Sequence, residues 1–460
     1  MKSGLLIHIT AHTLFAILAL SAVLAAQDRP TKKLPFYSVT DLGTLGGAFS
    51  VGVGINTRGL ISLNASTAGN AAQHVALWRS GNKTDLDTLG GPNSNTFWRP
   101  TIAAVVTGFS DTSTPDPLGT DFCSFGTQLI CRGFVWRDGV MSALPTLGGN
   151  NSLASAINDF GLVGGYAENT TLDKTCARPQ YEAKPVLWDK GIPQELPTLH
   201  GDRNGFIFGV NNKGQAVGGS SACINHAPSL HALLWRNGVP TDLGNLGGKL
   251  FTNALSLNDE GMVIGFSDLP GDTNYYLQPG SGSTGHAYLW SNGVMTDLGA
   301  LPGDVRSFPN AINNRGQVVG AGSRAILWQD GKVIDLNTLV PGPPFSPMYL
   351  LSANGINDRG EIVGLGLAAN GDVRAFLAVP CNTADADAPG CTSYAGNDAN
   401  LESNPSVPVD DTVNASERIV PRLWRPAGTP AWLRTGAFPG HQFSQPSNLR
   451  RKAPSSVPAN

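Results

Sequence analysis

Charged residues are scarce in this chain of 460 residues. Asp, Glu, Lys and Arg together make up 14% of it, and 31 basic residues nearly balance 34 acidic ones. Proteins that bind nucleic acids usually carry a basic face, so this balance argues against a nucleic-acid partner. The chain instead has 56 glycines and 32 prolines in a 41% hydrophobic sequence. That composition is typical of an all-β protein with many turns and enough apolar material for a large core.

Long apolar runs are also missing, except near the start. Lys2 is followed by an apolar stretch over residues 14–24, and the small residues Ala25 and Ala26 then precede polar sequence. This order predicts a secretory signal peptide over residues 1–26. The alternative is an uncleaved anchor, but the stretch is shorter than the roughly 20 residues that a spanning helix needs. We therefore expect a secreted, periplasmic or cell-surface protein with no stable membrane span after cleavage.

Cysteine is sparse, but an exported chain makes each one a disulfide candidate. The six are Cys123, Cys131, Cys176, Cys223, Cys381 and Cys391. Proximity in sequence favours the pairs Cys123–Cys131 and Cys381–Cys391, which leaves Cys176 with Cys223. No two cysteines have CxxC spacing and no histidine lies at finger-like spacing, so we expect no zinc site.

The dominant feature is a repeat of three short patterns in a fixed order. The first resembles Leu-Gly-Thr-Leu-Gly-Gly, as in residues 42–47 and 243–248. The second is an apolar residue and Asn-x-x-Gly before an apolar run, and its asparagines are Asn56, Asn158, Asn211, Asn258, Asn313 and Asn357. The third, His-Ala-x-Leu-Trp in its full form, ends on Trp78, Trp136, Trp188, Trp235, Trp290 and Trp328.

Each pattern has a local structural meaning. The tryptophans are 58, 52, 47, 55 and 38 residues apart, which fits about four short strands per unit, as in propeller repeats of roughly 40–50 residues. In Asn-x-x-Gly the asparagine can cap its own turn and the glycine takes positive φ. Asn-Gly or Asp-Gly after each tryptophan predicts a tight hairpin. The tryptophans themselves are expected in the core.

The two ends of the repeat are complementary. Residues 36–41 precede the first Leu-Gly-Gly segment without a tryptophan strand, and the last such strand, around residues 375–378, has no return strand after it. Pairing these ends would leave no exposed sheet edge. We therefore predict an all-β fold, a seven-bladed β-propeller over residues 36–379 that is closed by its N-terminal strand. A six- or eight-bladed ring and an open β-solenoid are the alternatives.

The three ordered patterns resemble the HAF repeat family of bacterial extracellular proteins. The best local matches are residues 242–248, 286–297 and 311–320, and the resemblance spans about residues 37–378. It implies an exported repeat protein without a shared catalytic set. The histidine of the third pattern is found at His74, His231 and His286, and the pattern aligns Gly133, Pro185 and Ala325 elsewhere.

No catalytic, cofactor or metal site is expected. The repeated histidines and the aspartates after each hairpin (Asp85, Asp242, Asp297 and Asp335) could form base–orienter pairs, but a pair repeated around a ring is better explained as structural. Asp202, Asp272 and Asp304 lie in glycine-rich turns without a calcium-loop pattern. Gly-x-Ser-x-Gly, P-loop and dinucleotide motifs are absent from the sequence.

Binding is therefore the favoured function. Three polar insertions, residues 111–131, 168–183 and 267–285, could present an extracellular ligand-binding surface for a glycan or a protein, and Trp98 lies outside the repeat position as a candidate stacking ring. The alternative is a secreted hydrolase that cleaves carbohydrate or another polymer at the channel mouth. Residues 380–460 lack the repeat, and we expect a low-complexity tail that is largely disordered or loosely docked.

Overall fold

The computed structural model describes residues 34–174, 180–222, 231–272, 284–340, 346–381 and 391. The chain divides into two units, Met1–Pro35 and Phe36–Asn460, and every described strand lies in the second. The predicted signal peptide, most of the tail, and both Cys176 and Cys223 lie outside the described residues. Within the described part, no helix has the length and hydropathy of a membrane span.

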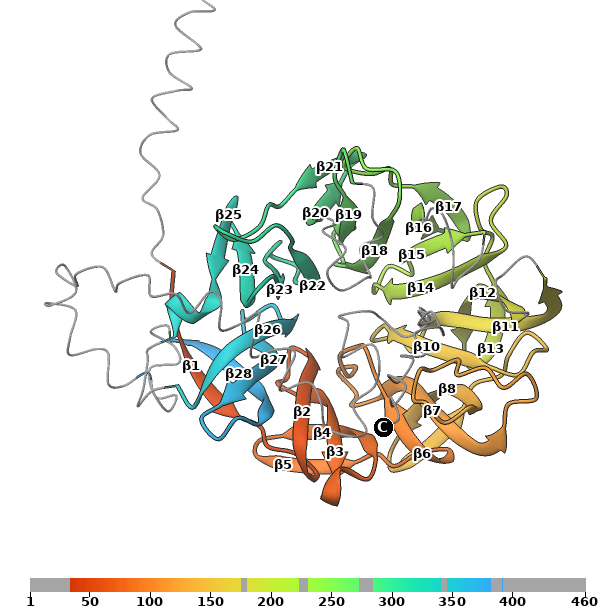
Figure 1. The fold of residues 1–460 in the computed structure, drawn as a ribbon, viewed down its shortest axis with the longest axis horizontal. Coiled ribbons are helices and arrows are strands. Elements are labelled where there is room, and N and C mark those ends of the chain that lie inside the picture. The colour runs from red at the N-terminus through yellow and green to blue at the C-terminus, as the bar shows by residue number, and fades with distance from the viewer. Residues whose placement is uncertain are drawn as a thin grey trace, which may run out of the picture. The chain divides into compact units, whose positions relative to one another are not determined.

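The described residues are all-β apart from two short 3-10 helices, η1 (Ala68–Asn70) and η2 (Leu336–Leu339). Five sheets have four antiparallel strands each, paired in chain order (Figure 1). They are β6 (Gly90–Asn95), β7 (Val106–Pro115), β8 (Leu129–Arg137) and β9 (Val140–Ala143); β10 (Ser152–Ile157), β11 (Val163–Asp173), β12 (Gln180–Asp189) and β13 (Ile192–Glu195); β14 (Asn204–Val210), β15 (Ala216–Ser221), β16 (His231–Arg236) and β17 (Val239–Asp242); β18 (Thr252–Leu257), β19 (Val263–Asp268), β20 (Gly285–Ser291) and β21 (Val294–Asp297); and β22 (Phe308–Ile312), β23 (Val318–Ala321), β24 (Ala325–Gln329) and β25 (Lys332–Asp335).

The sixth sheet contains strands from both ends of the described chain. Its order is β26-β27-β28-β2-β3-β4-β5, with β1 also paired to β28. The strands are β1 (Phe36–Asp41), β2 (Gly46–Ile55), β3 (Ile61–Thr67), β4 (Gln73–Arg79), β5 (Asn82–Asp85), β26 (Met348–Ile356), β27 (Ile362–Ala368) and β28 (Val373–Cys381). β1 is antiparallel to β28, with Val39 opposite Ala378, whereas β2 meets β28 through one parallel residue pair, Phe49 and Val373.

The predicted hairpins after the tryptophans are present. Both central residues have positive φ in Asp138-Gly139, Asn237-Gly238, Asn292-Gly293 and Asp330-Gly331. This is the I′ geometry that matches the twist of the flanking strands. Each hairpin joins the third and fourth strands of its sheet, and the fourth strand is a short edge strand.

A glycine in the second strand of each sheet allows the main chain of the first strand to pack directly against it. A Cβ added to Gly265 of β19 would lie 2.0 Å from the carbonyl oxygen of Asn253 in β18, where the β18–β19 register shifts by one residue. The equivalent glycines make the same approach, at 1.9 to 2.1 Å: Gly108, Gly165, Gly218, Gly320 and Gly364. A side chain at these positions would clash with the main chain of the first strand and separate the two strands.

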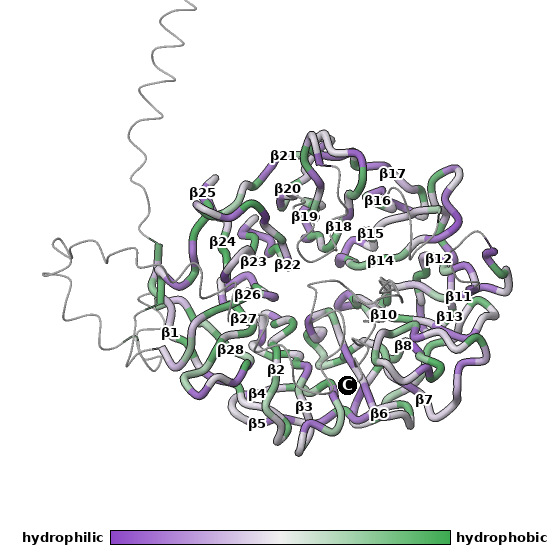
Figure 2. The backbone as a smooth tube through the Cα atoms, viewed as in Figure 1, coloured by the Kyte–Doolittle hydropathy of each residue, from purple (hydrophilic) through white to green (hydrophobic). Residues whose placement is uncertain are grey.

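The core lies between neighbouring sheets. One cluster joins Val217 and Leu234 of one sheet to Leu257 and Trp290 of the next. Hydrophobic residues accordingly run along the strands in Figure 2, and the turns are more polar. Five of the repeat tryptophans are buried, and Trp78 is partly buried. The indole N–H groups of Trp188 and Trp235 donate to the carbonyls of Pro145 and Pro197.

Candidate functional site

The six Asn-x-x-Gly turns adopt the geometry that the sequence predicts. In the first, Asn56 Oδ1 accepts the N–H groups of Arg58 and Leu60 at 2.9 and 3.0 Å, and Gly59 has a φ of 76°. The same two bonds recur at the other five asparagines. Each turn joins two consecutive antiparallel strands, such as β2 and β3. The two hydrogen bonds to the asparagine hold its conformation.

The asparagine amide groups also connect each turn to another turn, which the sequence analysis missed. Each Nδ2 donates to the main-chain carbonyl at the equivalent position of the following turn, at 2.8 to 3.0 Å. The bonds run from Asn56 to Thr101, Asn158 to Asn211, Asn211 to Asn258, Asn258 to Asn313, Asn313 to Asn357, and Asn357 to Asn56. An asparagine is needed because one side chain must both accept within its turn and donate across to the next.

The residue after five of the six asparagines forms a second series, here called the Asx row: Asp159, Asn212, Asp259, Asn314 and Asp358. The main-chain N–H of each of the first four donates to the side-chain Oδ1 of the next, at 2.8 to 2.9 Å. The side-chain amides of Asn212 and Asn314 also donate to Asp259 and Asp358. Because amides alternate with carboxylates, donors meet acceptors along the row. The signal was present in the sequence as alternating Asn-Asp and Asn-Asn dipeptides.

One repeat unit departs from this pattern. Between β6 and β7 the sequence lacks Asn-x-x-Gly, yet Thr101–Ala104 forms the same turn. The Thr101 hydroxyl accepts the N–H of Val105, and Ala104 takes the positive φ of 62° that glycine has elsewhere. Ile102 stands at the Asx-row position. Arg99, just before the turn, makes a two-bonded ion pair with Asp159 at 3.0 to 3.1 Å.

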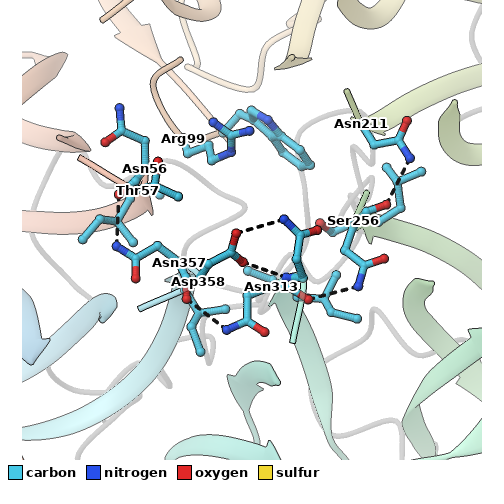
Figure 3. A pocket seen from close by; sticks show the side chains of 18 of the residues that line it. Asn56, Thr57, Arg99, Asn211, Ser256, Asn313, Asn357 and Asp358 are labelled. Atoms are coloured by element: carbon cyan, nitrogen blue, oxygen red, sulfur yellow. Dashed lines mark hydrogen bonds between the residues drawn. The ribbon is translucent and has the colours of Figure 1, made fainter. Parts of the chain in front are cut away.

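These turns line a pocket of about 250 Å³ (Figure 3). Its wall includes the Asx row, Thr57, Ile102 and the departing segment Phe97, Trp98 and Arg99. The Trp98 side chain is partly buried, and its indole N–H is buried with no hydrogen-bond partner among the described residues. The pocket therefore combines carboxylates, amides, one guanidinium and aromatic rings.

One acid of the pocket, Asp159, is held in its charged form. Burial alone would raise the pKa of Asp159, but the hydrogen bonds and charge of Arg99, with N–H donors from Ile102 and Asn212, leave that pKa below its usual value. A carboxylate with a lowered pKa accepts hydrogen bonds well and is a poor proton donor.

The predicted histidine–aspartate pairs form away from the pocket. His74 Nδ1 lies 2.9 Å from Asp85, and His286 Nδ1 lies 2.9 Å from Asp297. His231 instead contacts Asp202, at 2.9 Å. The hydrogen bond that His74 donates to the Asp85 carboxylate raises the pKa of His74. None of these residues lines the pocket.

Strand register corrects the histidine alignment. Ala65 lies opposite His74, and the equivalent residues of two other sheets lie opposite Arg132 and Lys184 rather than Gly133 and Pro185. In the β23–β24 pair the register ends at Ala321 and Ala325, and Arg324 is the residue four before Trp328, as His74 is four before Trp78. The alignment was wrong by one residue because it placed a residue three before the tryptophan at the histidine position. Strand pairing shows that the histidine position lies four residues before the tryptophan. This position is basic in all of these sheets, and Arg324 bonds Asp335 in place of a histidine.

The turn acids Asp202, Asp272 and Asp304 have local partners. Asp202 bonds Ser220 and His231, Asp272 accepts the N–H of Thr284, and Asp304 accepts that of Ser323. Among the residues that the structure describes, no group of three His, Cys, Asp or Glu side chains could hold a metal ion.

The described ends of the three insertions lie at the opposite end of the sheets from the pocket, because each insertion joins a second strand to a third strand. Only the first, residues 111–131, is described throughout. Its predicted disulfide Cys123–Cys131 is confirmed, as is Cys381–Cys391. Phe122 and Phe125 of this insertion pack against Tyr166 and Phe109.

Comparison with known proteins identifies no family. No family model and no curated protein matches this sequence. Among solved structures, the chain is similar to a structural genomics protein of unknown function from Bacteroides thetaiotaomicron, with 11% identity and a TM-score of 0.30 over 76% of this chain and 99% of that one. So distant a likeness carries no argument about function.

Proposed function

We propose that this chain is an exported, non-enzymatic β-propeller of seven blades that binds a small ligand in the pocket between its Asn-x-x-Gly turns. The eight-stranded sheet divides naturally at the single parallel pair of Phe49 and Val373. The strands then form seven four-stranded blades, and β1 provides the fourth strand of the last. The bond from Asn357 to Asn56, joining the last turn to the first, supports closure of the ring.

Export is supported by the two disulfides and by the predicted signal peptide. Disulfides persist in oxidising compartments, and each of the two closes a short loop in this chain. The resemblance to HAF repeats points the same way.

The observation that carries the binding proposal is that one blade, β6–β9, differs in sequence from the others where it lines the pocket. Repeated positions serve the architecture of a ring, whereas a ligand needs a unique set of groups. Phe97, Trp98 and Arg99 supply that set in a single blade, on a wall stiffened by hydrogen bonds between turns. Rigid walls lower the entropic cost of binding.

A binding array of glycans, peptides and small metabolites, probed with purified residues 27–460, tests the proposal. Bound ligand should be lost in Trp98→Ala and Arg99→Gln. It should be retained in Val239→Ser, which changes a side chain that is 65% exposed on an outer hairpin. Binding that survives both pocket variants would place the site elsewhere, for example on the insertions.

The alternative is hydrolysis of a polymer at the channel mouth. A general hydrolase screen run beside the array distinguishes the two. Turnover that a single pocket substitution abolishes would replace the binding proposal with the hydrolase.

A further inference from the structure

Two main-chain donors in the pocket lack the acceptor that their equivalents have. Ile102 and the first four residues of the Asx row donate their N–H groups to the aspartate or asparagine of the following turn. The turn after that of Asp358 has Thr57 at the row position, and the turn after that has Ile102. The N–H groups of Asp358 and Thr57 therefore meet a side chain that offers no carboxylate or amide. Within the described residues, neither N–H has a hydrogen-bond partner.

Both donors are in the pocket, next to the blade that breaks the repeat. Thr57, Ile102 and Asp358 belong to its lining, as does Arg99. Figure 3 shows Thr57, Arg99 and Asp358 around the same space. The Asx row is therefore interrupted at the blade that carries Trp98 and Arg99.

Three arginines lie next to the pocket, outside a lining whose charged residues are Arg99, Asp159, Asp259 and Asp358. Arg315, Arg359 and Arg58 occupy the third position of three consecutive turns, and all three are exposed. Arg359 Nη1 donates to the carbonyl of Thr57 at 2.7 Å and its Nη2 pairs with Glu361 at 2.6 Å, so the guanidinium is fixed beside the gap. The Asp358 carboxylate itself accepts from Asn314 at 2.8 and 2.9 Å, whereas the main-chain N–H of Asp358 has no partner among the described residues.

We propose that the ligand of this pocket carries a carboxylate that completes the Asx row. One of its oxygens accepts the Thr57 N–H, as Asp159 Oδ1 accepts the Ile102 N–H at 2.9 Å. The other accepts the Asp358 N–H. Hydrogen bonds from paired main-chain donors to an ionised acceptor are among the stronger ones, and neighbouring arginines add to them. This inference rests on the proposed binding function.

The size of the pocket limits the ligand. At about 250 Å³ it is smaller than common ligand pockets of roughly 300–1,000 Å³. A small organic acid or one acidic sugar ring fits that limit, whether free or at the end of a polymer. Phe97 and Trp98 would contact the apolar face of such a ring.

Titration calorimetry with four probes tests the proposal: galacturonate, its methyl ester, a galacturonate oligomer, and lactate. Galacturonate or lactate should bind, and the neutral ester should bind at least tenfold more weakly than galacturonate. Binding of the oligomer but not the monomers would identify a polymer end as the source of the same carboxylate. Equal binding of acid and ester would overturn the carboxylate while leaving the pocket as the site.

The decisive variant is Ile102→Asp, which places a carboxylate where the row lacks one. It should weaken binding of the acid at least tenfold and leave the melting temperature unchanged or raised, because the Thr57 N–H gains an internal partner. The matched control Val239→Asp adds the same charge on an outer hairpin, at a side chain that is 65% exposed and outside the pocket lining, and it should bind within threefold of the unmodified protein. If Ile102→Asp does not fold, Thr57→Asp makes the same test at the Asp358 N–H. Undiminished binding in the folded aspartate variant would overturn the proposal, and absence of binding by all four probes and by every compound of the array would overturn the pocket function itself.

Discussion

Ala104 shows how a single residue can carry strain inside an otherwise regular repeat. It occupies a left-handed position with a φ of 62°, where the other turns have glycine. In this conformation an L-residue is destabilised by roughly 1–2 kcal/mol relative to glycine. Ala104→Gly should therefore raise the free energy of unfolding by about 1 kcal/mol in urea titrations.

Ala103→Gly is the matched control for this change. It makes the same replacement one residue earlier, where φ is not positive. We expect it to be neutral or destabilising, because glycine there only adds entropy to the unfolded chain. Equal stabilisation by both variants would contradict the strain argument.

Glu168 should make stability depend on pH. Its side chain is 1% exposed, and burial raises its pKa to about 7, while the nearby Asp116 adds to the rise. A pKa raised in the folded state contributes stability at low pH that is lost as the pH rises from about 4.5 through 7. The free energy of unfolding should therefore fall across this range.

Glu168→Gln should remove most of that fall and stabilise the protein at pH 8 by about 2–3 kcal/mol. Its Oε1 can still accept from the N–H groups of Asn150 and Asn151, which the Glu168 carboxylate bonds at 3.1 and 2.8 Å. Asp330→Asn removes an exposed hairpin carboxylate and should leave the slope unchanged. Urea titrations at four pH values measure both. An unchanged slope in Glu168→Gln would show that other groups cause the dependence.

At the scale of one element, the glycine of each second strand should be intolerant of any side chain. A Cβ at Gly265 would overlap the Asn253 carbonyl oxygen. That oxygen belongs to main chain that cannot move without displacing β18. Gly265→Ala should lower the free energy of unfolding by about 3 kcal/mol.

Gly271→Ala separates this clash from ordinary glycine strain. Gly271 has a φ of 91° but nothing within 4 Å of an added Cβ. Its substitution should cost only about 1 kcal/mol. Thermal or urea unfolding of the two variants compares them directly, and similar costs would mean that β18 adjusts to the added methyl group.

Elements were predictable from the sequence where local chemistry decides the structure. Asn-x-x-Gly and Asn-Gly define their turns through their own backbone and side-chain bonds, so those turns could be placed before any packing was known. The turn at Thr101–Ala104 was missed because threonine and alanine adopt it under constraint from the flanking strands. The pairing of Asn amides with the next sheet was also missed, since it depends on neighbours about 45–55 residues away.

At the scale of the whole molecule, the pocket could not be read from one repeat. It arises because equivalent turns converge, and its distinctive feature is the absence of an aspartate or asparagine at Thr57 and Ile102. A missing side chain has meaning only after the register of the other turns is known. The repeat itself was readable, because three patterns recur in order at each unit.

The N-terminal strand offers the last test, because proposed closure makes it essential to the whole ring. Tyr37 and Val39 are 1% and 7% exposed, and β1 pairs with β28 over six residues. A chain that begins at residue 43 should lose about 3–5 kcal/mol of stability, since the buried side chains are removed and the edge of β28 is exposed. A synthetic peptide of residues 34–42 should restore the unfolding midpoint, whereas the same peptide with Val39→Asp should not. An unfolding midpoint equal to that of the longer chain would mean that β1 is an accessory strand and that closure rests on the turn contacts of Asn357 and Asn56 alone.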